Sequence, residues 1–203
     1  MEGFFEEYLG KRKADIIVAV LELADRHGIR GITTKRIAGE VGFVEGALYK
    51  HIESKTEAFS LILDMFGELL TERFRLLEKE KPAADEALRE WFVYAAEALE
   101  KYPGIYRILF SDELYIEGKE VFSRFKDIIV FMMKKISHIV ERGMQSGVLG
   151  KNIKKELVPI RYLGVIQTAF TFWNLVDERK KGLVEIALPI FEVFMESIRY
   201  REA

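Results

Sequence analysis

The segment VEGALYKHIESK, residues 44–55, carries the side chains whose types and spacing best indicate a chemical task. At 100° per residue, Val44, Leu48 and Ile52 fall on one stripe of a short helix, and we expect this stripe to be buried. The opposite face then carries two small residues, an aromatic hydroxyl and a cation: Gly46, Ala47, Tyr49 and Lys50. Small residues let a backbone approach base edges, and a hydroxyl or an ammonium can donate to phosphate oxygens. The pattern therefore favours contact with nucleic acid.

The helix expected just before this segment supports that interpretation. Ala38 is followed four residues later by Gly42, which is the pattern of a helix-turn-helix unit. Alanine permits close crossing of two helices, and glycine adopts the backbone conformation of the turn. In such a unit the second helix enters the DNA major groove. Thr34 begins the first helix, where backbone N–H groups favour an anion, and Lys55 begins the helix that follows.

The composition allows a globular protein and gives no support to an enzyme. The 203 residues are 49% apolar with a net charge of −2, but residues 10–55 carry nine basic against six acidic side chains. His27, His51 and His138 lie far apart and show no metal-ligand spacing. The sequence has no phosphate loop, dinucleotide fingerprint or nucleophile elbow. We therefore expect no catalytic residue, no metal and no cofactor.

The N-terminus and the cysteine content bear on location. The first ten residues, MEGFFEEYLG, lack the basic and apolar regions of a signal peptide, and the chain has no cysteine. We therefore expect a cytoplasmic protein. Residues 157–176 carry a single charge, Arg161, and are long enough for a membrane span. The polar Gln167 and Asn174 and the early Pro159 argue against a span, so we expect this segment either at a subunit interface or at the centre of a monomer.

Hydrophobic periodicity predicts an all-α fold. Ser54 and Glu57 form a capping-box pattern that begins a long helix, and KEKPAAD, residues 79–85, ends it. The predicted helices span about 11–27, 34–42, 45–51, 54–79, 85–101, 103–110, 118–146, 156–179 and 183–200.

Residues 11–59 resemble the tetracycline-repressor (TetR) family of transcriptional regulators, most specifically in TTKRIA, GALYKHI and SKTEAF. The resemblance implies that residues 1–53 form a three-helix DNA-binding domain with a helix-turn-helix. It also implies that residues 54–203 form a helical ligand-binding and dimerisation domain. The implied protein is a homodimer that pairs through its last two helices, about 156–179 and 183–200. It binds a palindromic DNA operator and responds to a small effector, and repression is the commoner behaviour in the family.

The resemblance also assigns DNA contacts by position: Thr34, Lys35, Val44, Glu45, Gly46, Ala47, Tyr49, Lys50, His51 and Lys55. Val44 stands where many members have a Ser or Thr cap, so the second helix lacks its usual first hydrogen bond. Glu45 stands where a basic or neutral residue is common. Its carboxylate could accept from cytosine N4 and would repel phosphate. His51 is as compatible with packing as with a phosphate contact.

Aromatic and methionine side chains are frequent after residue 90, and most of them must belong to the core. We expect an apolar pocket between helices of the C-terminal domain. Its candidate lining residues are Trp91, Tyr94, Tyr106, Phe110, Phe125, Met132, Phe170 and Trp173. Few ionisable residues occupy buried helical positions there, which favours a hydrophobic or amphipathic effector such as an acyl chain or an aromatic compound.

One other function class remains compatible with these residues. A helical adaptor could use the same helix-turn-helix unit to bind protein instead of DNA. The two functions differ in their response to salt, because binding to DNA weakens steeply as the salt concentration rises.

Overall fold

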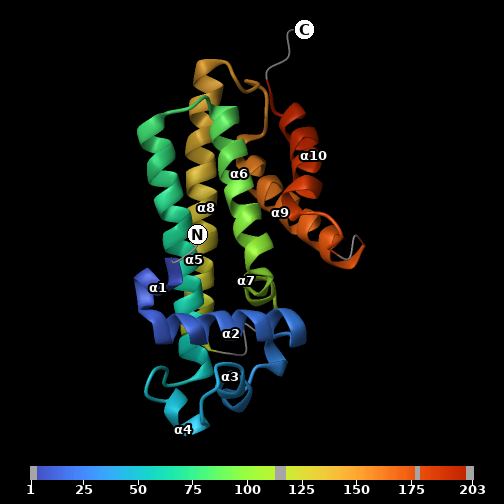
Figure 1. Cartoon of the computed structure of the whole chain (residues 1–203). Coiled ribbons are helices and arrows are strands. Elements are labelled where there is room, and N and C mark those ends of the chain that lie inside the picture. Colours follow the sequence, from blue (N-terminus) through green and yellow to red (C-terminus); the bar gives the residue numbers. More distant parts are fainter. Residues whose placement is uncertain (1–3, 113–117, 177–178, 200–203) are drawn as a thin grey trace. The chain divides into compact units, whose positions relative to one another are not determined.

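The computed structural model describes residues 4–112, 118–176 and 179–199. These residues form helices joined by short connections, with no strand among them, and an isolated antiparallel bridge pairs Leu149 with Arg199 (Figure 1). The predicted all-α class is therefore confirmed. None of the helices in the described part of the chain combines the length and the apolar character needed to span a bilayer.

The helices follow one another in the order α1 (Phe4–Leu9), α2 (Lys11–His27), η1 (Ile29–Gly31), α3 (Thr34–Glu40), α4 (Glu45–Leu48), α5 (Lys55–Glu80), α6 (Ala84–Lys101), α7 (Pro103–Leu109), α8 (Lys119–Ser146), η3 (Lys155–Leu157), α9 (Val158–Leu175) and α10 (Leu183–Glu196). Most predicted ranges agree to within one or two residues. Sequence periodicity missed α1, and it extended α9 and α10 beyond their observed ends. The 3-10 turn η3 replaces the predicted first turn of α9, and Pro159 then occupies the first turn of the α-helix.

The chain divides into two compact units. Unit 1 comprises residues 1–69 and 101–128, and unit 2 comprises residues 70–100 and 129–203. Helices α5 and α8 each contribute residues to both units. The functional boundary expected after residue 53 stays a prediction.

In unit 1, α2 is the central helix. Its Ile16, Ile17 and Val20 are fully buried, as expected of an amphipathic helix that covers a core. Helix α7 packs so closely on α2 that a Cβ at Gly104 would lie 2.0 Å from the Leu21 carbonyl oxygen. That distance is far below van der Waals contact, so only glycine fits at position 104.

In unit 2, the core is built from aromatic rings. Tyr162 of α9 is fully buried and donates its hydroxyl to the Leu88 carbonyl of α6 at 2.9 Å. Burial raises the pKa of the Tyr162 hydroxyl well above its usual value, because desolvation penalises the phenolate. The rings of Phe92 and Phe191 stack with centroids 4.3 Å apart, so the same cluster joins α6 to α10.

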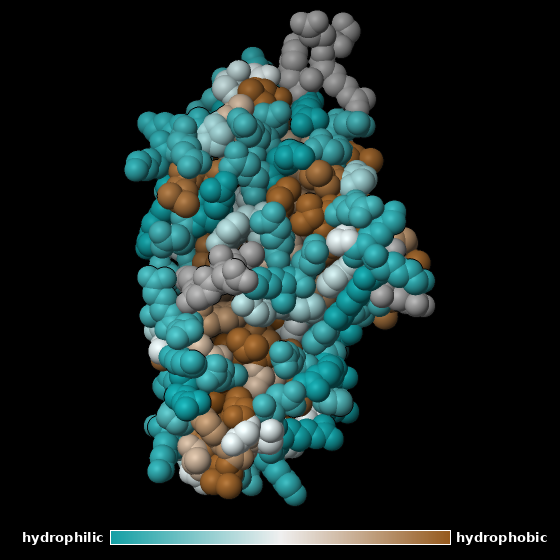
Figure 2. Space-filling view, in the orientation of Figure 1, coloured by the Kyte–Doolittle hydropathy of each residue, from teal (hydrophilic) through white to brown (hydrophobic). Residues whose placement is uncertain are grey.

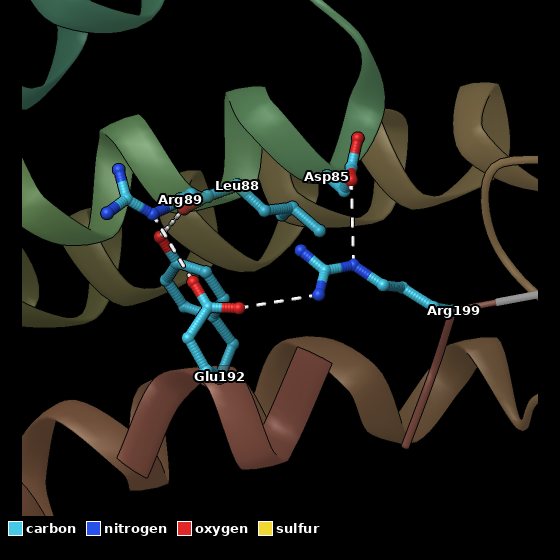
Figure 3. A network of polar contacts seen from close by, with 6 residues as sticks. Asp85, Leu88, Arg89, Glu192 and Arg199 are labelled. Atoms are coloured by element: carbon cyan, nitrogen blue, oxygen red, sulfur yellow. Dashed lines mark hydrogen bonds and ion pairs between the residues drawn. The ribbon is translucent and has the colours of Figure 1, made fainter. Parts of the chain in front are cut away.

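A network of ion pairs reinforces the contact between α6 and the C-terminal end of unit 2 (Figure 3). The Glu192 carboxylate lies between Arg89 (3.3 Å) and Arg199 (3.4 Å), and Arg199 also reaches Asp85 at 3.5 Å. These side chains are partly exposed, so each pair contributes little alone. Their shared partners make the contact a network that holds Arg199 against α6 and α10.

Candidate nucleic-acid interface and ligand cavities

Helix α3 begins at a local cap. The Thr33 side chain accepts a hydrogen bond from the Arg36 backbone N–H at 3.2 Å, so Thr33 is the N-cap and Thr34 is the first helical residue. Ile37 and Ala38 are buried, which fixes the helix against unit 1 and leaves Thr34 and Lys35 on its outward side.

The turn after α3 has the predicted glycine geometry. Gly42 has φ 72°, in the left-handed region that favours glycine. The Phe43 backbone N–H then donates to the Ala38 carbonyl at 2.7 Å. Ala38 and Gly42 therefore play the two roles that the helix-turn-helix pattern predicts.

Helix α4 is shorter than predicted, and its buried stripe differs. Backbone bonds from His51 and Ile52 to the Leu48 carbonyl extend its last turn. Leu48 and Ile52 are buried, whereas Val44 is 77% exposed, so the expectation that Val44 joins the buried stripe is wrong. Val44 is the N-cap and has extended backbone angles, so the helical-wheel angle does not apply to it. Its side chain also makes no capping hydrogen bond, as its type predicts.

The outward face of α4 has the predicted chemistry. Gly46 and Lys50 are exposed, Tyr49 is 52% exposed and Ala47 is half-buried. A Cβ placed at Gly46 would meet no atom within 4 Å, so the glycine leaves open space beside the backbone. Figure 2 shows hydrophobic surface in the region of α4, in keeping with the exposed Val44.

Two of the predicted contact residues are hydrogen-bonded to each other. The Thr34 hydroxyl donates to a carboxylate oxygen of Glu45 at 2.5 Å. The carboxylate therefore occupies the position from which an anion would approach Thr34. A phosphate in that place would have to displace Glu45 or accept its repulsion.

His51 and Lys55 are held by aromatic neighbours. The His51 ring stacks on Phe43 with centroids 5.7 Å apart, so His51 has a packing role. The Lys55 ammonium lies 5.6 Å from the Phe59 ring centroid. Sequence reasoning missed Arg12, whose guanidinium lies over the same Phe43 ring at 5.7 Å. The basic run KRK at residues 11–13 was the available signal.

The start of α5 is capped nearly as predicted. The Glu57 backbone N–H donates to the Ser54 hydroxyl at 3.1 Å. The Glu57 carboxylate returns to the Glu53 N–H at 2.5 Å, one residue earlier than in a standard capping box. A second oxygen of this carboxylate reaches Lys13 of α2 at 3.5 Å. These bonds position Lys55 just after the helix-turn-helix segment.

The residues expected to line a ligand pocket are divided between the two units. Tyr106, Phe110 and Phe125 belong to unit 1, where the Tyr106 and Phe110 rings lie 4.5 Å apart. The others belong to unit 2: Trp91, Tyr94, Met132, Phe170 and Trp173. Trp91, Met132, Phe170 and Trp173 are buried in its core. Their assignment to a pocket stays a prediction.

One cavity in unit 2 does include a predicted residue. Tyr94 lines a cavity of about 310 Å³ with Arg73, Arg89, Glu90, Val93 and Glu97. Arg73 forms an ion pair with Glu90 and lies 6.0 Å from the Tyr94 ring centroid. Burial raises the pKa of the Tyr94 hydroxyl, with a smaller opposing effect from the Arg73 charge.

A second cavity in unit 2 has a more apolar lining. Its volume is about 350 Å³, and it lies among α5, α6 and α8. Its lining residues are Phe74, Leu77, Glu78, Lys81, Ala87, His138, Ile139 and Arg142. None of these eight was predicted from the sequence to line a pocket, although Leu77, Glu78 and Lys81 lie beside or within the predicted break at residues 79–85.

Comparison with known proteins shows which proteins resemble this chain in sequence and in fold. No protein-family model matches the chain. Its sequence is similar to the nucleoid occlusion factor SlmA of Edwardsiella ictaluri, with 26% identity over 138 residues that cover 67% of this chain and 70% of that protein. SlmA of Shewanella baltica is 27% identical over 140 residues, again covering 67% of this chain and 70% of that protein.

Solved structures match over nearly the whole chain. The ketosteroid transcriptional regulator KstR2 of Mycobacterium tuberculosis superimposes with a TM-score of 0.81 at 19% identity, covering 94% of this chain and 96% of that one. FadR of Bacillus subtilis, in complex with stearoyl-CoA, gives 0.70 at 22% identity over 91% and 98%. FadR of Thermus thermophilus, a TetR-family repressor in complex with lauroyl-CoA, gives 0.60 at 19% identity over 95% and 97%. The resemblance inferred from residues 11–59 is thereby confirmed, and this chain has the fold of the TetR family of transcriptional regulators.

Proposed function

We propose that this protein is a ligand-responsive transcriptional repressor that binds a palindromic DNA operator as a homodimer and is released by a small effector. The observation that carries the proposal is the outward face of α4. Leu48 and Ile52 anchor the short helix, and Gly46, Tyr49 and Lys50 extend away from the protein. A surface with a small residue, a hydroxyl and a cation fits a DNA groove and its phosphates.

The proposed contacts divide into two kinds. Tyr49, Lys50 and Lys55 donate to phosphate oxygens and set the orientation of the protein, together with Lys35 of α3. The Thr34 hydroxyl can join them only after it has left the Glu45 carboxylate. Gly46 and Ala47 let the α4 backbone approach the base edges, where Val44 and Glu45 can discriminate between bases. His51 contributes by supporting Phe43.

A homodimer is supported by the surface of α9 and α10. Both helices expose large apolar side chains, among them Ile160, Phe172, Leu175 and Val193. Exposed apolar side chains of this size favour burial against a second copy. A dimer of this kind would carry two copies of α4 and would read two half-sites about 34–36 Å apart.

Release by an effector requires that the ligand prefer one conformation of the dimer. A ligand that binds more tightly to the conformation that does not fit the operator shifts the population away from DNA by that difference in affinity. In this proposal α5 is a covalent link that begins directly after the helix-turn-helix segment, since it contributes residues to both units, as α8 also does. The protein then acts in the cytoplasm, where it meets both DNA and metabolites.

The nucleoid occlusion named for the sequence relatives is the second candidate function. It also rests on DNA binding. The ligand-responsive function is favoured here because unit 2 contains a cavity of about 350 Å³ with an apolar floor, a size within the usual range for small-molecule sites.

Selection of bound duplexes from a random pool with the purified full chain tests the proposal. We expect enrichment of a palindrome, and an affinity that falls steeply with salt. Sedimentation should give a dimer, and Phe172→Lys should shift it toward monomer. Enrichment of no duplex at any salt concentration would contradict DNA binding and would favour the adaptor function.

A further inference from the structure

The cavity lined by Phe74 and Arg142, here called the α5–α6–α8 cavity, has a buried apolar floor. Its four apolar lining residues, Phe74, Leu77, Ala87 and Ile139, are each at most 3% exposed. They come from three helices of unit 2, so the floor exists only when α5, α6 and α8 are packed together. Such a surface offers favourable burial to an apolar ligand group of limited length.

The edge of this cavity is cationic. Lys81 and Arg142 line it together with His138, while the single acidic lining residue, Glu78, is neutralised by Lys135 at 3.6 Å. Lys135 also lies over the Phe74 ring at 4.0 Å. The balance of charge in the lining is therefore positive, and Lys81 is exposed and Arg142 half-buried, in contrast to the buried apolar residues of the floor.

The two cations keep donors available. One terminal nitrogen of Arg142 donates to the Pro82 carbonyl at 2.8 Å. The other guanidinium N–H groups, and the Lys81 ammonium, have no protein partner among the described residues. An arginine that is anchored at one nitrogen and has further donors is well suited to a carboxylate, because its fork can make two parallel hydrogen bonds.

Local backbone geometry fixes the cations at the opening. Lys81 directly follows α5 with φ 49°, in the left-handed region, and its N–H donates to the Leu77 carbonyl at 2.9 Å. Gly143, next to Arg142, lets α8 approach α6 closely, since a Cβ there would lie 2.7 Å from the Ala84 Cβ. The position of Arg142 therefore depends on a helix contact that a larger residue at 143 would prevent.

We propose that the α5–α6–α8 cavity binds an amphipathic carboxylate, a fatty acid of medium chain length, with its tail on the apolar floor and its carboxylate between Lys81 and Arg142. The volume of about 350 Å³ is at the low end for small-molecule sites. It suits a single short chain and leaves no room for a nucleotide-sized head inside. The proposal deepens the proposed function, because this ligand is the effector.

Calorimetric titration of the full chain with decanoate, without DNA, tests binding at this site. We expect saturable binding that weakens by about tenfold, equivalent to about 1.4 kcal/mol, in Arg142→Gln and in Lys81→Gln. Lys154→Gln is the matched control, since Lys154 is an exposed cation of unit 2 that does not line the cavity. It should bind decanoate like the parent.

Three further probe molecules distinguish the contribution of the apolar tail to binding from that of the carboxylate head. Decanol shares the tail and has a neutral head, so its affinity should be lower than that of decanoate and equal in parent and Lys81→Gln. Acetate should not bind measurably. Lauroyl-CoA binding that is tighter than decanoate and insensitive to Lys81→Gln would contradict the carboxylate assignment, as would equal decanoate affinity in all variants.

The chosen variants and measurements distinguish an effect on ligand binding from an effect on folding or on DNA binding. Lys81 is exposed, so Lys81→Gln keeps the test valid if Arg142→Gln unfolds, and circular dichroism reports folding of each variant. If decanoate binds but no duplex does, the regulatory function fails and the site stands. If duplexes bind but decanoate does not, the site fails and the DNA-binding function stands.

Discussion

The α3–α4 segment of unit 1 and the α5–α6–α8 cavity of unit 2 both place cations beside apolar residues, but in opposite arrangements. In α4, Leu48 is buried beneath the helix and Tyr49 and Lys50 extend outward. In the cavity, the apolar side chains form a concave floor, and Lys81 and Arg142 stand at its edge.

In the two proposals, cations of the same sign are therefore assigned different partners because of the shape of the surface around them. An outward cationic face suits an extended polyanion, because successive phosphates can meet successive donors. A concave apolar surface with cations at its edge suits a compact anion whose apolar part can leave water. The predictions below test whether the two sites can be changed independently.

The largest effect is expected from reversing the charge of Lys50. Lys50→Glu should weaken duplex binding by at least about tenfold and lower the slope of log affinity against log salt by about 1, because one phosphate contact is lost and a repulsion is added. A gel-shift titration at several salt concentrations measures both. Decanoate affinity should not change. Lys154→Glu serves as the control, and an equal loss in that variant would mean that net charge alone governs binding.

The next effect concerns the cavity. Ala87→Leu places three additional carbon atoms on the floor and should weaken decanoate binding by about tenfold, since the added side chain competes with the ligand tail. Duplex affinity in the absence of ligand should equal that of the parent. Thermal unfolding must be measured alongside, because overpacking costs about 1–3 kcal/mol. Unchanged decanoate affinity in a folded variant would place the tail elsewhere.

A smaller effect of opposite sign is expected from Glu45→Gln. The substitution removes the negative charge beside Thr34, so duplex affinity should rise by about threefold through reduced repulsion of phosphate. Selection on random duplexes with this variant would also show whether Glu45 reads a cytosine, because glutamine prefers adenine. A fall in affinity on the parent operator, with a changed base preference, would show that base reading by Glu45 outweighs its repulsion of phosphate.

The smallest effect is expected from Tyr49→Phe. It removes one hydroxyl and leaves the exposed ring, so duplex affinity should fall by about twofold, the low end of the range for a single neutral hydrogen bond at an exposed site. Fluorescence anisotropy with a labelled operator resolves such a change. An unaltered affinity would reduce Tyr49 to a surface residue.

The sequence predicts the α3–α4 segment well because its signals are local. Gly42 needs its positive φ within the turn itself, and the Ser54–Glu57 pair caps α5 within four residues. The error at Val44 arose because a wheel was applied to a residue with extended backbone. Bounds of α2 were right for the same local reason, since Gly28 ends the helix.

The α5–α6–α8 cavity could not be predicted in this way. Its lining comes from three helices whose rotation about their axes is set by tertiary packing, and aromatic density cannot tell a cavity wall from a core. Trp91 and Phe170 satisfied the aromatic criterion and are core residues. Lys81 and Arg142 do not meet this criterion, because they are cations near the ends of helices and the criterion selects apolar side chains.

The exposed Val44 has a consequence for the bases that the protein prefers. Val44 is the N-cap of α4, and its two methyl groups are exposed to solvent. A polar residue that caps the helix normally occupies this position. In the major groove the apolar feature that the Val44 side chain can contact is the 5-methyl group of thymine. Half-sites recovered by selection should therefore be enriched in thymine at one position, and replacing that thymine with uracil should weaken binding of the parent but not of Val44→Ser.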